Sequence, residues 1–208
     1  MYGVAAFLCP SRLRNSMPKF VAAVCLVFAF SFPHPARAQG DESVRKLAEP
    51  CFACHGPGGN STNPDYPVLA GQSWRYIYIQ LKDFNEGRRA DPVMSAMAAG
   101  LSRDDMIALG NFFAAQKPLP IAFKADGAKV EAGRKISDAV LCPMCHLGGF
   151  VGQNEIPKVA GQYPQYIRKQ LLDFRAKRRT NDAGNMTSVA ASLSDDDIEN
   201  LTQYIANL

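Results

Sequence analysis

An arrangement of two cysteines and a histidine occurs twice in this chain, 91 residues apart. Residues 51–55 read CFACH and residues 142–146 read CPMCH. In a Cys-x-x-Cys-His pattern the two thiols add to the vinyl groups of a haem, and the adjacent imidazole is brought to the iron from the same side. Two copies predict two covalently attached haem c groups, bound through Cys51, Cys54, Cys142 and Cys145, with His55 and His146 as iron ligands.

Other uses of paired cysteines fit this sequence less well. Two Cys-x-x-Cys pairs can hold one structural zinc ion, but zinc gives no reason for a histidine after both pairs. A thioredoxin-type redox pair needs a strand before it and a helix after it, whereas glycine, proline and asparagine follow His55. Cysteines three positions apart rarely form a structural disulfide. Haem attachment is therefore the use that both motifs favour.

The two halves of the chain repeat each other well beyond these motifs. PVLAGQ at 67–72 matches PKVAGQ at 157–162, and residues 76–89 share eight identities with residues 166–179, all at an offset of 90. Repetition over a whole half indicates two domains of one kind. Prolines interrupt any helix between them, so the predicted organisation is a first domain at 39–117, a linker at 118–126 and a second domain at 127–208.

Each half is patterned as helices and no strand pattern competes, so the predicted fold class is all-α. Helices are expected at 43–49 and 129–140, ahead of the motifs, and at 74–85 and 164–176, where apolar residues recur along one face. The last helix of each half is expected after a serine cap, with acidic residues in its first turn. Halves of about 80 residues bury little apolar surface alone. A covalently held haem would complete each core.

A histidine on one side of each iron leaves the opposite position open, and a methionine sulfur there gives a high-potential electron-transfer site. Met186 is the candidate in the second half, because Met144 lies between the cysteines, and Met94 aligns with Met186 at an offset of 92. Met97 and Met106 align with residues that cannot ligate, so we expect them to be ordinary core side chains. The predicted axial ligands are therefore His55 and Met94 for the first iron, and His146 and Met186 for the second.

Residues 1–38 have the pattern of a secretory signal peptide. They contain no acidic residue, carry early positive charges, run apolar over 13 residues from 20 to 32, and end at Ala36-Arg37-Ala38. A membrane-spanning helix needs roughly 20 apolar residues, which makes an anchor the weaker alternative. Translation from Met17 instead of Met1 would also give a compact signal. We expect cleavage after Ala38 and export to the periplasm.

The charge of the chain after this segment argues against nucleic acid as a partner. Four of the 23 basic residues precede residue 39, and the remaining 19 balance 19 acidic residues. Nucleic-acid binding needs a basic excess gathered on one face. We therefore expect no nucleic-acid partner, and at most a peripheral association with membranes.

Taken together, these motifs resemble the dihaem cytochrome c4 family over the whole of residues 39–208. The resemblance is carried by the two haem motifs, both Pro-x-x-Ala-Gly-Gln segments, the Tyr-Ile-x-x-Gln-Leu helices, and Met94 or Met186 ahead of Leu-Ser-x-Asp-Asp. It implies two tandem class I cytochrome c domains related by a pseudo-twofold axis, with His/Met-ligated irons. It also implies that the carbonyls of Pro67 and Pro157 accept hydrogen bonds from the ligand imidazoles and orient them.

The second half departs from the family pattern at two positions. Leu147 follows Cys-His where a glycine is expected, and Lys177 stands where the first half has Gly87. The resemblance therefore predicts the loops at the second haem less firmly than those at the first. Nearby, Arg88 and Arg178 are candidate partners of the haem propionates, with a solvated charged face as the alternative.

Three functions are open to a chain with these sites. The first, which we favour, is a periplasmic one-electron carrier that is not an enzyme and passes electrons from a cytochrome complex or other donor toward a terminal oxidase. The second is the dihaem electron-accepting subunit of a periplasmic dehydrogenase complex, such as a flavoprotein sulfide dehydrogenase. The third, a peroxidase or ligand sensor, requires a vacant or weakly held sixth position at one iron.

Overall fold

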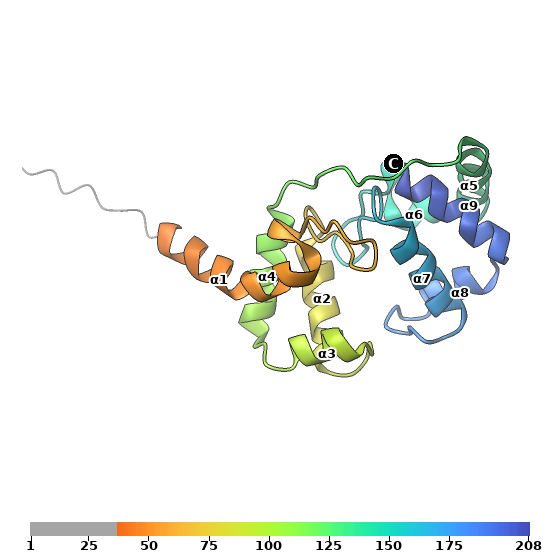
Figure 1. Ribbon diagram of the computed structural model, residues 1–208. Coiled ribbons are helices and arrows are strands. Elements are labelled where there is room, and N and C mark those ends of the chain that lie inside the picture. Colours follow the sequence, from red (N-terminus) through yellow and green to blue (C-terminus); the bar gives the residue numbers. More distant parts are fainter. Residues whose placement is uncertain (1–36) are drawn as a thin grey trace, which may run out of the picture. The chain divides into compact units, whose positions relative to one another are not determined.

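Helices joined by loops make up residues 37–208, the part of the chain that the computed structural model describes (Figure 1). Side chains are described from residue 42 onward. In this range the only extended pairing is an isolated bridge between Gln153 and Ile156, so the all-α prediction is confirmed. Most of the expected signal segment lies outside the described residues.

The first half contains four α-helices and one short 3-10 helix. Helix α1 includes the first haem motif and continues through Pro50, although the missing proline N–H costs one backbone hydrogen bond. It is therefore longer than the predicted segment 43–49. The elements are α1 (Arg37–His55), η1 (Pro57–Gly59), α2 (Trp74–Asn85), α3 (Pro92–Ala98) and α4 (Arg103–Ala114).

The second half follows the same order with one difference. Leu141 adopts a left-handed conformation, with φ 62° and ψ 33°, so the second motif forms a separate short helix instead of continuing the preceding one. The elements are α5 (Gly127–Ala139), α6 (Cys142–His146), η2 (Gly148–Phe150), α7 (Pro164–Arg175), α8 (Asn185–Ala191) and α9 (Asp195–Ala206).

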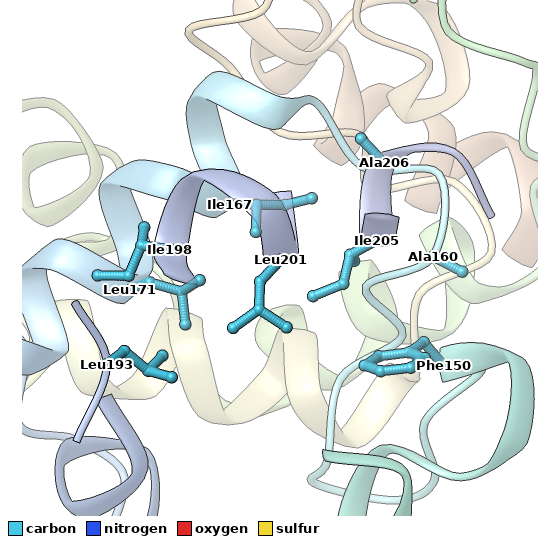
Figure 2. Packing of buried hydrophobic residues seen from close by; sticks show 9 residues of the cluster. All are labelled: Phe150, Ala160, Ile167, Leu171, Leu193, Ile198, Leu201, Ile205 and Ala206. Atoms are coloured by element: carbon cyan, nitrogen blue, oxygen red, sulfur yellow. The ribbon is translucent and has the colours of Figure 1, made fainter. Parts of the chain in front are cut away.

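Each half has its own apolar core between its first and last helices. In the first half, Ala48 of α1 packs with Ile77 of α2 and with Leu109 and Phe113 of α4. The core of the second half is larger and surrounds Leu201 of α9 (Figure 2). Its buried members are Phe150, Ala160, Ile167, Leu171, Leu193, Ile198, Leu201, Ile205 and Ala206.

The halves also contact each other directly. A third apolar cluster joins Val68 and Ala70 of the first half to Tyr163 of the second, with Ile121 of the linker packed against it. The Tyr163 hydroxyl donates a hydrogen bond to the Ser61 carbonyl at 2.8 Å. Residues 36–208 accordingly form one compact unit.

Candidate haem-binding sites

The two histidines of the motifs have the same environment. His55, at the end of α1, is buried, and its Nδ1 lies 2.9 Å from the carbonyl oxygen of Pro67. His146, at the end of α6, is buried and lies 2.9 Å from the carbonyl of Pro157. A carbonyl only accepts, so each Nδ1 carries a proton and each Nε2 keeps a lone pair for a metal. The hydrogen-bond partners implied for Pro67 and Pro157 are therefore in place.

Burial also keeps both imidazoles neutral. It lowers the pKa of His55 and of His146, and the hydrogen bonds to Pro67 and Pro157 offset only part of this effect. An imidazole must be neutral to coordinate a metal. Both rings are thus in the protonation state and tautomer that binding to iron requires.

None of the four motif cysteines forms a disulfide within the described residues. Cys51 packs against the core of the first half and Cys142 against that of the second, and burial raises the pKa of both thiols. The two pairs do not come together. Among the side chains described from residue 42 onward, no three histidine, cysteine or acidic groups are close enough to hold a metal ion, so the single zinc site is not assembled. Two thiols beside a neutral imidazole in each half fit a covalently bound haem.

The candidate methionine ligands both lie near the beginning of a seven-residue helix. Met94 is half-buried in the first turn of α3, where the Asp91 carboxylate accepts hydrogen bonds from the N–H groups of Val93 and Met94, at 3.1 and 2.9 Å. Met186 is half-buried in α8 and packs against the core of the second half. These positions agree with the repeat alignment that selected the two residues.

The other two methionines of the first half have different positions. Met106 is 4% exposed, so its prediction as a core residue is confirmed. The same prediction for Met97 is wrong, because its side chain is 42% exposed. Helix α3 buries Ala98, and the adjacent Met97 is turned about 100° away from that contact.

The loop after the second motif keeps the shape of the first despite its different sequence. Leu147 has φ 64° and ψ 168°, close to φ 73° and ψ 165° at Gly56. Lys177 has φ 55° where the corresponding Gly87 has φ 74°. The backbone conformations that glycine adopts in the first half are thus imposed on larger residues in the second.

Arg88 and Arg178, predicted as propionate partners, pair with aspartates of their own halves. The Nε atoms of Arg88 and Arg178 lie 2.8 Å from Asp83 and Asp173, and their side chains are 49% and 63% exposed. Arg88 also contacts Glu86. Of the neighbouring arginines, Arg179 is buried and Arg89 is half-buried.

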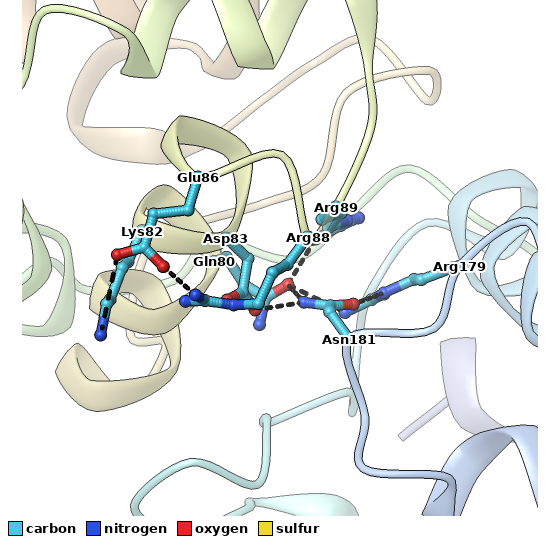
Figure 3. A network of polar contacts seen from close by, with 8 residues as sticks. All are labelled: Gln80, Lys82, Asp83, Glu86, Arg88, Arg89, Arg179 and Asn181. Atoms are coloured by element: carbon cyan, nitrogen blue, oxygen red, sulfur yellow. Dashed lines mark hydrogen bonds and ion pairs between the residues drawn. The ribbon is translucent and has the colours of Figure 1, made fainter.

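Arg89 and Arg179 form a symmetric polar network between the halves. Each donates to the glutamine of its own half, Gln80 or Gln170, and reaches across to the glutamine and tyrosine of the other half. Figure 3 shows Gln80 with Arg89 and Arg179, which both donate to it. The contacts across the junction are Arg89 to Tyr166 and Gln170, at 3.2 and 3.0 Å, and Arg179 to Tyr76 and Gln80, at 3.1 and 3.0 Å.

The guanidinium groups of Arg89 and Arg179 donate their hydrogen bonds to uncharged side chains. Each lies over a phenylalanine ring of its own half, Phe84 or Phe174, and within the described residues neither forms an ion pair with a carboxylate. Burial alone would raise the pKa of Tyr166. The positive charges of Arg89 and Arg179 lower this pKa by more, so the net shift is downward. The sequence signal for this network is the repeated Arg-Arg pair, whose first member in each half, Arg88 or Arg178, is the predicted propionate partner.

Comparison with known proteins follows the same division into halves. The cytochrome c family model matches residues 42–116 and 130–208. Cytochrome c4 of Azotobacter vinelandii is 37% identical over 208 residues, which cover 90% of this chain and 98% of that protein. The crystal structure of reduced cytochrome c4 from Pseudomonas stutzeri matches with a TM-score of 0.75 at 37% identity, over 81% of this chain and 98% of that one.

The chain belongs to the cytochrome c4 family. Cytochromes c4 are dihaem electron carriers, so this chain binds two haem c groups covalently and transfers electrons instead of catalysing a reaction of its own. A further relative, the thiosulfate dehydrogenase electron acceptor of Thiomonas intermedia, is 34% identical over 171 residues, 76% of this chain and 78% of that protein. Among the described helices, none is long and apolar enough to cross a membrane.

Proposed function

We propose that this cytochrome c4 family member carries single electrons in the periplasm, with each haem held by one half of the chain. The observation that carries the proposal is the repeated contact between a motif histidine and a proline carbonyl, at 2.9 Å in both halves. Haem iron supplies the redox chemistry, because it takes up and releases one electron. The proposed domains are 39–117 and 127–208, joined by the linker 118–126.

The residues of the chain have distinct proposed roles around each haem. Cys51 and Cys54 would attach the first haem and Cys142 and Cys145 the second, while the hydrogen bond from each histidine Nδ1 to a proline carbonyl would leave Nε2 free to bind iron. The sulfurs of Met94 and Met186 would supply the second protein ligand of each iron. The proposed axial ligands are His55 with Met94, and His146 with Met186.

The propionates of the haems are better matched by Arg89 and Arg179 than by Arg88 and Arg178. A buried charge is costly unless an opposite charge or several hydrogen bonds compensate it. Arg88 and Arg178 already form ion pairs with carboxylates. Arg89 and Arg179 donate hydrogen bonds only to neutral side chains, although the nearby Asp91 also raises the pKa of Arg89. A propionate would supply the missing negative charge at the junction.

We propose a cytochrome complex as the donor and a terminal oxidase as the acceptor. A second candidate is supported by the relative that is named as the electron acceptor of thiosulfate dehydrogenase. In this alternative the chain accepts electrons from a periplasmic dehydrogenase. That enzyme would resemble thiosulfate dehydrogenase or a flavoprotein sulfide dehydrogenase. Copurification from native membranes and periplasm separates the two: a stoichiometric dehydrogenase partner favours the alternative, and an oxidase favours the first proposal.

Intact mass measurement tests haem attachment and export together. After extraction with acidified acetone, covalently bound haem stays on the chain. We expect the mass of the chain after the signal segment plus two haem groups, with an N-terminus at Gln39 or Gly40. A mass equal to the bare polypeptide contradicts the proposed attachment, and an intact N-terminus contradicts the cleavage after Ala38.

A further inference from the structure

Gln72 and Gln162 bind the backbone of the opposite half in the same way. The Gln162 side chain accepts a hydrogen bond from Val68 N–H at 2.9 Å and donates one to the Val68 carbonyl at 3.0 Å. Gln72 does the same at Lys158, at 2.9 and 2.8 Å. Both glutamines are buried, with 7% and 8% of their surface exposed. A flipped amide would set donor against donor, so these partners fix its orientation.

The peptide units that the glutamines hold are the same units that contact the motif histidines. The carbonyl of Pro67 and the N–H of Val68 belong to one planar peptide, and this carbonyl lies 2.9 Å from His55 Nδ1. The carbonyl of Pro157 and the N–H of Lys158 form the equivalent unit at His146. A chain of hydrogen bonds thus runs from each histidine, through one peptide, to a glutamine of the other half.

We propose that Gln162 tunes the reduction potential of the first haem and Gln72 that of the second, each from the opposite half. Donation by the peptide N–H polarises the peptide and makes its carbonyl a stronger acceptor. A stronger acceptor at Nδ1 raises the basicity of the imidazole. A more basic ligand stabilises ferric over ferrous iron and lowers the potential. Gln72 and Gln162 are therefore positioning residues, and this inference rests on the proposed ligation by His55 and His146.

The test uses the full-length dihaem protein and measures each haem separately. Gln162→Met keeps the length of the side chain and removes both of its hydrogen bonds to Val68. A redox titration followed by NMR resolves the two haems through their shifted methyl resonances. We expect Gln162→Met to raise the midpoint potential of the first haem and leave the second unchanged. Gln72→Met is expected to do the reverse.

Two further variants separate tuning from packing. In Gln162→Glu the carboxyl group, charged or protonated, still accepts from Val68 N–H, so the potential of the first haem is expected not to rise. Tyr163→Phe removes a hydrogen bond to Ser61 across the same junction, and the lost hydroxyl bonds to neither of the peptides that contact the histidines. This variant keeps the ring that packs against Val68 and is expected to shift neither potential. The His55 Nδ1 proton is expected to exchange with solvent faster in Gln162→Met alone.

Three patterns of change in the potentials would overturn the proposal. They are a rise at the haem of the variant's own half, equal shifts at both haems, and a rise with Gln162→Glu as large as that with Gln162→Met. Normal imidazole signals without any change in potential also overturn it, while leaving the proposed ligation intact. A wild-type spectrum without two axial imidazoles overturns the ligation and this inference with it.

Discussion

At the residue scale, an aspartate precedes each candidate methionine and organises its helix. The Asp91 carboxylate accepts from the N–H groups of Val93 and Met94. In the second half, Asp182 accepts from the N–H and hydroxyl groups of Thr187, the residue after Met186. Burial raises the pKa of Asp182, but these hydrogen bonds lower it more, so the net shift is downward. In both halves an aspartate side chain thus accepts backbone hydrogen bonds in the first turn of the ligand helix.

Substitutions at Met94 and Met97 distinguish a ligand from its neighbour. Met94→Ala should remove the share of the first haem in the weak sulfur-to-iron absorption band and lower the potential of that haem, because the sixth ligand is lost. Met97 is exposed, so Met97→Val should change the free energy of unfolding by less than about 0.5 kcal/mol. Absorption spectra and urea titrations measure both effects. Loss of the band in Met97→Val, with its retention in Met94→Ala, would contradict the assignment.

Leu147 offers a test of backbone strain beside the second haem. A non-glycine residue at φ 64° and ψ 168° costs about 1–3 kcal/mol, whereas glycine adds about 0.5–1 kcal/mol of unfolded-state entropy. Leu147→Gly should therefore raise the free energy of unfolding by roughly 1 kcal/mol, as measured in urea. Leu147→Ala retains the strained Cβ and is the control. An equal gain from alanine would show that strain is not the cause.

At the element scale, short local signals and close packing position the helices. Helix α4 begins with a capping box formed by Ser102 and Asp105, and helix α9 begins with one formed by Ser194 and Asp197. Helix α5 can cross α9 only at Gly133, because a Cβ atom there would lie 2.1 Å from the Asn200 carbonyl oxygen. The ends of these helices are set locally, but their crossing depends on a residue of another helix.

The cap of α9 predicts a pH-dependent loss of stability. The Ser194 hydroxyl and N–H donate to Asp197 and lower its pKa. A lowered carboxyl pKa contributes stability above the unfolded value of about 3.9 and loses it as the pH falls through the folded value. Ser194→Ala should cost about 1 kcal/mol at pH 7 and less at pH 3. Urea titrations at both values measure this.

The equivalent cap of α4 is the matched control for that experiment. Ser102 also donates to Asp105 through its hydroxyl and N–H groups and lowers the pKa of Asp105. Ser102→Ala is expected to show the same decrease in penalty between neutral and acidic pH. A penalty that is equal at the two pH values in both variants would mean that ionised aspartate does not contribute to the caps.

At the scale of the whole molecule, polar and apolar contacts hold the two halves together. The glutamine contacts of Gln72 and Gln162 and the network around Arg89 and Arg179 repeat the same interactions in both directions. The cluster of Val68, Ala70 and Tyr163 adds an apolar contact between the halves. Because each half supplies partners for buried groups of the other, the halves are expected to unfold together.

Tyr163→Phe tests this cooperativity. It leaves the buried Ser61 carbonyl without the tyrosine donor, which should cost about 1–2 kcal/mol. Fluorescence of Trp74, the single tryptophan, follows the first half although the substitution lies in the second. We expect its urea midpoint to fall together with that of total helicity. Tyr78→Phe, whose hydroxyl forms no hydrogen bond within the described residues, is the control, and an unshifted Trp74 transition in Tyr163→Phe would show that the halves unfold independently.

The sequence by itself determined the two haem motifs, the duplicated helical halves, the serine caps and the selection of Met94 and Met186, because each depends on short-range spacing or on comparison of one half with the other. Only the tertiary structure decided which of the paired arginines is buried, why Met97 is exposed, and that Leu147 adopts a glycine conformation. It also revealed that Gln162 contacts Val68, 94 positions earlier in the chain. Such contacts depend on how helices pack and on which buried groups lack partners, and no local pattern encodes either.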